Sequence, residues 1–173
     1  MQENRLITKG IEVGHIFYFG DKYSKPLNAN VDLQGGKKTS VKMGSYGIGV
    51  SRLVAAIIEA KFNNNIMKWP ISVSPYEVAI IPMISKNDNS NLTKSQNIYK
   101  ELIKYNIDVL LDDTDENISA KIKKFNLIGI PYQIIIGQKS EGNIFEFKEI
   151  DKESQNLSID KVVQKLTKEK SLI

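Results

Sequence analysis

The chain has 173 residues, of which 41% are hydrophobic and 25% are charged, a composition typical of globular rather than disordered proteins. Cysteine is absent and histidine occurs once, so disulfide frameworks, cysteine-based zinc sites and His-rich metal sites are excluded. No apolar run reaches the roughly 18 residues of a membrane-spanning helix, and the polar segment 1–5 is unlike a secretion signal. We therefore expect a soluble, cytoplasmic protein with no membrane partner.

Basic charge is concentrated in the first part of the chain. Residues 1–75 contain 10 Lys and Arg against 5 Asp and Glu, whereas the remainder contains 14 against 15. A positive first half suits a polyanion or a phosphorylated ligand, and it equally suits a solvated lysine-rich surface. Only Arg5 and Arg52 are arginines among the 24 basic residues. In a chain so rich in lysine, an arginine is a candidate functional residue.

The region 1–62 is predicted to contain few elements. Residues 10–19 are predicted to form a strand, and residues 40–43 a short one. Apolar residues at helical spacing predict an amphipathic helix over residues 49–62. Because two or three strands and one helix cannot enclose a core, we expect this region to belong to a larger domain.

Residues 63–75 are the predicted linker. Asn63-Asn64-Asn65 favours turns, and the prolines of Trp69-Pro70 and Ser74-Pro75 restrict the residue before each of them to extended backbone.

Residues 76–173 have the alternating pattern of an α/β domain. Strands are predicted at 77–83, 107–111, 132–136 and 144–150, with helices around 92–105, 118–125 and 159–166. This order predicts a mostly parallel sheet flanked by helices, in a domain large enough to fold alone.

Residues 43–52 join a predicted strand to the predicted helix and contain three glycines. Glycines let a backbone approach a ligand closely, and a helix start offers free N–H groups to an anion. Arg52 lies about 200° around the helix from Val50, at about 100° per residue, and therefore points away from the apolar face. Its guanidinium suits phosphate oxygens, although a tight turn beside an exposed arginine explains the same spacing. The segment matches neither a dinucleotide-binding motif nor a P-loop.

Several motifs resemble one enzyme family. Gly44-Ser-Tyr-Gly-Ile-Gly-Val-Ser-Arg52 resembles the third signature motif of class II aminoacyl-tRNA synthetases. Gly10-Ile-Glu-Val-Gly-His-Ile-Phe17 and Lys22-Tyr-Ser-Lys25 resemble bacterial-type prolyl-tRNA synthetases, rather than threonyl- or histidyl-specific relatives. The resemblance continues, in the order found in that family, through Trp69-Pro70, Ser74-Pro75-Tyr76, Leu111-Asp112-Asp113 and Leu127-Ile-Gly-Ile-Pro131.

The resemblance implies that residues 1–62 are part of the antiparallel catalytic sheet and that residues 76–173 are an α/β anticodon-binding domain. It implies that Arg52 is a catalytic residue holding the ATP triphosphate. The remaining implied site residues are Glu12, His15, Gly47 and Gly49 for ATP, and Phe17 and Ser45 for proline. Taken without the family, His15 and Phe17 fit a structural role and Glu12 fits a solvent-facing strand position. Ser45 stands where many bacterial relatives have cysteine.

The candidate tRNA-binding residues lie at a strand-to-helix junction and on the helix that follows it. They are Asp112, Asp113, Glu116, Lys121, Lys123 and Lys124. Helical spacing predicts that Lys123 and Lys124 face outward and that Lys121 lies near the edge of the buried stripe. Thr114 replaces an arginine that is common in relatives. The acidic residues serve equally well as helix caps, and the three lysines serve equally well as solvated surface residues.

The implied parent enzyme activates proline with ATP and Mg²⁺ and transfers it to tRNA(Pro), as a homodimer. The first two signature motifs of the family are not present in this sequence, so we expect the chain alone to be inactive in catalysis and to bind tRNA, with no metal site of its own. The alternative is a non-catalytic nucleic-acid-binding accessory module derived from such a synthetase.

Overall fold

The computed structural model describes residues 7–64, 66–85, 88–137, 140 and 142–171. It divides into two units, Met1–Glu59 and Ala60–Ile173. Asn65 of the predicted linker lies outside the described residues.

The first unit is built from two antiparallel strand pairs. Strand β1 (Gly14–Gly20) pairs with β4 (Met43–Ile48), and β2 (Asn30–Asp32) pairs with β3 (Lys38–Ser40). Helix α1 (Val50–Lys61) begins two residues after β4 ends. Strand β1 starts four residues later than predicted. The predicted strand 40–43 is wrong in its position, because residues 41–42 separate β3 from β4.

Apolar side chains in the first unit remain on its surface. Among its described residues only Ser24 and Ala56 are buried. Tyr46 is 80% exposed and Ile48 is 72% exposed, although both lie in the paired strand β4. A single layer of strands cannot cover its own faces, so these apolar side chains stay exposed.

The second unit contains one five-stranded sheet with helices on both faces. Its strand order is β6-β5-β7-β8-β9. The strands are β5 (Val78–Pro82), β6 (Val109–Leu111), β7 (Tyr132–Ile136), β8 (Ile144–Glu149) and β9 (Gln155–Ser158). The helices are α2 (Ser90–Lys104), α3 (Ile118–Ile128), α4 (Ile159–Lys170) and the short 3₁₀ helix η1 (Ile71–Val73). The α/β fold predicted from the sequence is confirmed.

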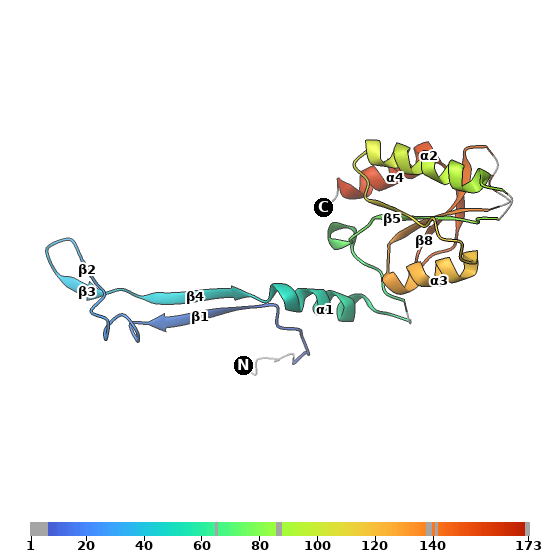
Figure 1. The fold of residues 1–173 in the computed structure, drawn as a ribbon. Coiled ribbons are helices and arrows are strands. Elements are labelled where there is room, and N and C mark those ends of the chain that lie inside the picture. Colours follow the sequence, from blue (N-terminus) through green and yellow to red (C-terminus); the bar gives the residue numbers. More distant parts are fainter. Residues whose placement is uncertain (1–6, 65, 86–87, 138–139, 141, 172–173) are drawn as a thin grey trace, which may run out of the picture. The chain divides into compact units, whose positions relative to one another are not determined.

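The sheet is more mixed than predicted. Strand β5 runs parallel to β6 and β7, whereas β8 runs antiparallel to β7 and to β9. Strand β9 was not predicted, because its sequence Gln-Asn-Leu-Ser contains one apolar residue. Helices α2 and α4 lie over one face of the sheet and α3 over the other (Figure 1).

Two cores result from this layering. Val78 and Ile80 of β5 belong to the larger core, and Ala79 and Ile81 belong to the smaller core under α3. All four are fully buried, because helices cover both faces and the strand alternates its side chains between them.

Part of the predicted linker packs against the end of α3 within the second unit. The Trp69 amide donates to the carbonyl of Gly129 (3.0 Å), and its indole N–H donates to that of Ile128 (2.9 Å). Gly129 has φ +85°, and a Cβ placed there would lie 2.9 Å from the Met67 carbonyl oxygen. Glycine is therefore required at this helix end, both for the left-handed backbone and for the close approach.

Candidate functional sites

The β1–β4 ladder brings together residues from two distant motifs. Phe17 lies opposite Ser45, and His15 lies opposite Gly47. Residues directly opposite one another in an antiparallel pair share a face, and so do residues two apart on one strand. His15, Phe17 and Ser45 therefore share one face of the pair. The His15 and Phe17 rings stack with centroids 4.1 Å apart.

The glycine segment is a strand over residues 43–48, rather than the connection between a strand and a helix that the sequence predicted. Residues 43–48 form β4, and their backbone groups take part in the ladder with β1. Pairing with a distant strand outweighs the turn preference of glycine in this segment. Gly47 has open space where a Cβ would lie, so the strand leaves room on its surface for a ligand.

Arg52 joins Glu12 and His15 in one polar cluster. Arg52 lies in the first turn of α1, and its Nη1 donates to the Glu12 carbonyl oxygen at 3.2 Å. The same nitrogen lies 3.6 Å from Glu12 Oε1, which in turn lies 3.8 Å from His15 Nδ1. All three side chains are at least half exposed, so these contacts contribute little stability. Such a cluster leaves the guanidinium free to exchange Glu12 for an anionic ligand.

Gly49 gives Arg52 its position next to the end of β4. A Cβ at Gly49 would lie 3.2 Å from the Cβ of Arg52. A larger residue at position 49 would therefore push against the arginine side chain. The five residues predicted for ATP and the two predicted for proline all lie on β1, on β4, or next to them.

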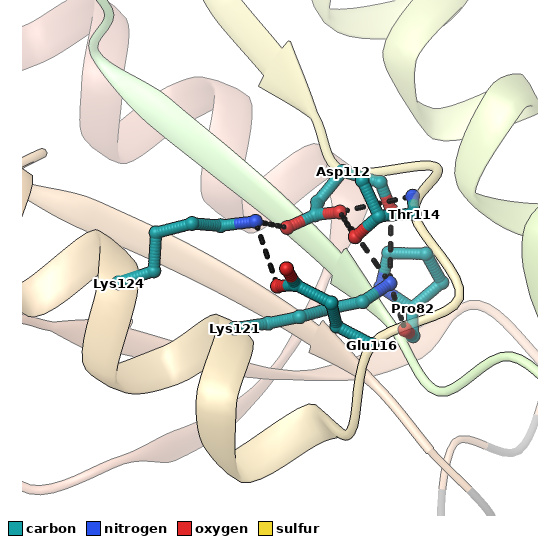
Figure 2. A network of polar contacts seen from close by, with 6 residues as sticks. All are labelled: Pro82, Asp112, Thr114, Glu116, Lys121 and Lys124. Atoms are coloured by element: carbon teal, nitrogen blue, oxygen red, sulfur yellow. Dashed lines mark hydrogen bonds and ion pairs between the residues drawn. The ribbon is translucent and has the colours of Figure 1, made fainter.

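The second candidate site lies at the carboxyl ends of the parallel strands. In open α/β sheets, ligands bind at this edge, where the connections leave in opposite directions. Asp112 follows β6, and Pro82 ends β5. Lys121 Nζ lies 3.3 Å from the carbonyl oxygens of both residues and 3.5 Å from Asp112 Oδ1 (Figure 2).

Asp112 also organises the loop that follows β6. Its Oδ1 accepts a hydrogen bond from the Thr114 amide (3.0 Å) and another from the Thr114 hydroxyl. Its Oδ2 lies 2.7 Å from Lys124 Nζ, which also contacts Glu116 at 3.1 Å (Figure 2). Burial by itself raises the pKa of Asp112. The bonds from Lys124 and Thr114 and the charge of Lys121 outweigh that effect, so the pKa of Asp112 lies below its ordinary value. The bond to Asp112 raises the pKa of Lys124.

The predicted tRNA-binding residues differ in exposure. Asp113, Glu116 and Lys123 are exposed, and Lys124 is partly buried. The predicted position of Lys121 near the edge of the buried stripe is wrong, since its side chain is fully buried. The Asp112 side chain is only 2% exposed. Neither of these two buried side chains reaches a ligand directly.

A cavity of about 360 Å³ lies at the same edge of the sheet. It is lined by residues that sequence reasoning missed, namely Met83, Ile135, Gly137, Ser140, Glu146 and Asn156, together with Ile118. Met83 and Gly137 directly follow parallel strands, and this placement is the one signal in the sequence that points to them.

Within the described residues there is no group of three or more His, Asp or Glu residues placed to hold a metal ion. The same residues include no helix that is long and apolar enough to span a membrane.

Comparisons with known proteins assign the second unit to a family. The family described as "Anticodon binding domain" matches residues 77–169. A proline–tRNA ligase of Pelagibacter ubique is 67% identical over 171 residues, which is 98% of this chain and 38% of that protein. One from a Wolbachia of Brugia malayi is 49% identical over 85% of this chain and 34% of its own length, and one from Rhodopseudomonas palustris is 43% identical over 95% and 38%.

This chain thus spans less than two fifths of the length of the curated relatives that it matches. Within that span the similarity covers both units, and the family match covers the sheet with its three long helices. The chain belongs to the anticodon-binding domain family, and it is homologous to a portion of the proline–tRNA ligases.

Proposed function

We propose that this chain is the C-terminal part of a cytoplasmic, homodimeric proline–tRNA ligase that activates proline with ATP and Mg²⁺ and transfers it to tRNA(Pro). Residues 1–62 would contribute to the catalytic domain, residues 63–75 would connect, and residues 76–173 would bind the anticodon. We expect the chain by itself to bind tRNA without catalysing activation.

The observation that carries this proposal is the polar cluster beside the β1–β4 ladder. Glu12 lies within hydrogen-bonding or ion-pairing reach of both Arg52 and His15. In the proposed enzyme, the Arg52 guanidinium holds phosphate oxygens of ATP, and Glu12 and His15 lie on the same side. Phe17 and Ser45, paired across the ladder, would form the wall of the proline pocket. Electrostatic clamping of the triphosphate is how such a site lowers an activation barrier.

In the second unit, we propose that RNA binds at the carboxyl edge of the sheet. Single-stranded bases in RNA loops are recognised by stacking and by hydrogen bonds to their edges. The cavity there has apolar walls from Met83 and Ile135 and polar groups from Glu146 and Asn156, which suits one splayed base. Residues 76–173 have a balance of charge close to neutral, so binding depends on a few local contacts rather than on a broad basic surface.

The test for RNA binding uses the full chain and tRNA(Pro). We expect tighter binding to this tRNA than to the same tRNA with altered anticodon bases, measured by fluorescence anisotropy. The double variant Lys123→Ala/Lys124→Ala should weaken binding and reduce the salt slope, since each phosphate contact contributes about 0.7 to 0.9. Lys161→Ala/Lys168→Ala, on α4, is the matched control and should leave both unchanged. Equal affinity for the two tRNAs would contradict anticodon recognition.

The test for the ATP role uses the full-length ligase. Arg52→Lys keeps the charge but loses the planar pair of donors, so ATP–pyrophosphate exchange should fall severely. Lys37→Ala, at an exposed position directly before β3 in the same unit, should retain wild-type exchange. Normal exchange in Arg52→Lys would remove Arg52 from the site.

The alternative is an accessory module that binds nucleic acid and has no catalytic parent. Such a module does not need to bind ATP. The Arg52–Glu12–His15 cluster, which suits a phosphate group, therefore favours the ligase. RNA binding that ignores the anticodon, combined with unaltered exchange in Arg52→Lys, would favour the module.

A further inference from the structure

One lysine in the second unit is buried where most lysines are exposed. The Lys121 side chain has no exposed surface, although it lies on α3 between the exposed Ala120 and the half-buried Ile122. Lysine is almost never fully buried unless it is paired, because removing an ammonium group from water is costly. The contacts of Lys121 therefore have to compensate for that cost.

The partners of Lys121 lie at the ends of two neighbouring strands. Its Nζ is 3.3 Å from the Pro82 carbonyl oxygen, at the end of β5. It is also 3.3 Å from the Asp112 carbonyl oxygen, directly after β6, and 3.5 Å from the Asp112 carboxylate. One ammonium group thus ties two parallel strands to the helix that crosses beside them (Figure 2).

The same carboxylate fixes the loop over residues 113–117. Asp112 Oδ1 accepts from the Thr114 amide at 3.0 Å and from its hydroxyl, which anchors the start of the loop. The Asn117 side chain accepts from the Ser119 amide at 2.8 Å and caps α3, which anchors its end. Asp113 and Glu116 are exposed between these anchors.

We propose that Lys121 is a positioning residue for RNA recognition: its buried ammonium group holds Asp112 and thereby keeps the 113–117 loop in the conformation that contacts RNA. This inference rests on the proposed function, in which this edge of the sheet binds tRNA. A loop that is already ordered loses no conformational entropy when RNA binds. Since the entropy cost of ordering even one residue corresponds to roughly a tenfold change in affinity, a preformed loop should bind RNA more tightly.

The experiment compares the full chain with its variant Lys121→Met, using an RNA hairpin that carries the proline anticodon. Lys121→Met should raise the Kd about tenfold at a temperature where circular dichroism shows the variant fully folded. It should also speed hydrogen exchange at the Thr114 amide, the donor to Asp112. Val162→Ala is the control, since Val162 is fully buried in the other core. This control should lower the melting temperature while leaving the Kd and Thr114 exchange unchanged.

Unchanged affinity and unchanged Thr114 exchange in folded Lys121→Met would overturn the inference, as would an equal loss of affinity in Val162→Ala. If Lys121→Met does not fold, Asp112→Asn carries the same comparison, because it keeps the acceptor for Thr114 and removes the charge that Lys121 faces. Failure of the wild-type chain to bind the hairpin would refute the proposed function. In that event, Thr114 exchange still decides whether Lys121 orders the loop.

Discussion

Two isoleucines show how strongly the burial of apolar side chains differs between the two units. Ile134 of β7 and Ile48 of β4 both lie in paired strands, yet Ile134 is fully buried and Ile48 is 72% exposed. Strand β7 has strand neighbours on both sides and helices over both faces of its sheet (Figure 1). Among the residues that the structure describes, β4 pairs with β1 alone. Hydrogen-bonded pairing is thus sufficient to shape a strand, but only further layers bury its side chains. Over residues 7–59, the first unit has the backbone of a sheet without a core.

This comparison is tested most severely by cutting the chain. A fragment of residues 66–173 should unfold cooperatively on heating, because it contains both cores and the docked Trp69 segment. A fragment of residues 1–62 should show no cooperative transition, since it buries almost nothing. Circular dichroism melts of the two fragments measure this. A sharp transition in the shorter fragment would show that the first unit has a core after all.

A matched pair of substitutions sharpens the contrast within the intact chain. Ile134→Ala should lower the free energy of unfolding by about 2–5 kcal/mol, through lost burial and a cavity. Ile48→Ala should change it by no more than about 0.5 kcal/mol, because the side chain is largely in water. Urea denaturation measures both. Similar losses at the two positions would mean that both strands are equally buried in solution.

A smaller effect is expected where the Trp69 segment meets α3. Gly129→Ala should destabilise the second unit by about 1–3 kcal/mol, because it forces a side chain into left-handed backbone against the Met67 carbonyl. Gly137→Ala is the control, since no atom lies within 4 Å of a Cβ built there. Thermal melts compare the two variants. Equal melting temperatures would show that residues 67–69 move away from the new side chain with little loss of stability.

The smallest expected effect is a loss of stability of the second unit in acid. The folded pKa of Asp112 lies below its usual value of 3.8, so Asp112 stabilises the fold above that pH and less as pH falls through its folded pKa. Burial raises the pKa of Glu149, but its bonds with Lys68 and Lys152 outweigh burial. The pKa of Glu149 therefore also lies below its usual value of 4.5. Unfolding free energy should therefore decline below about pH 4. Asp112→Asn should flatten part of this decline, and an unchanged profile would remove Asp112 as its source.

The sequence predicted the α/β unit well because that unit is buried on both faces. Strand Val78–Pro82 is a continuous apolar run, and Tyr132–Ile136 is apolar except for Gln133. Helices α2 and α3 carry clear helical spacing. The mostly polar β9 carried no such pattern, although Leu157 packs against the larger core.

The sequence identified many of the candidate site residues, but it did not predict how these residues are arranged in space. The motif residues of the first unit could be named from the sequence, but the strand at residues 43–48 depends on pairing with β1, about 30 positions earlier. Burial of Lys121 depends on the Pro82 carbonyl, 39 positions away, and helical spacing contains no information about such a partner. Partners distant in sequence decided each of these differences.

The docking of Trp69 also gives the chain a built-in optical probe. Trp69 is the single tryptophan of the sequence, and its indole donates to the Ile128 carbonyl at the end of α3. Its emission therefore reports the state of the second unit and is silent about the first. A shift of that emission to longer wavelength on denaturation would follow release of the indole from α3, while the seven tyrosines, present in both units, respond to the whole chain.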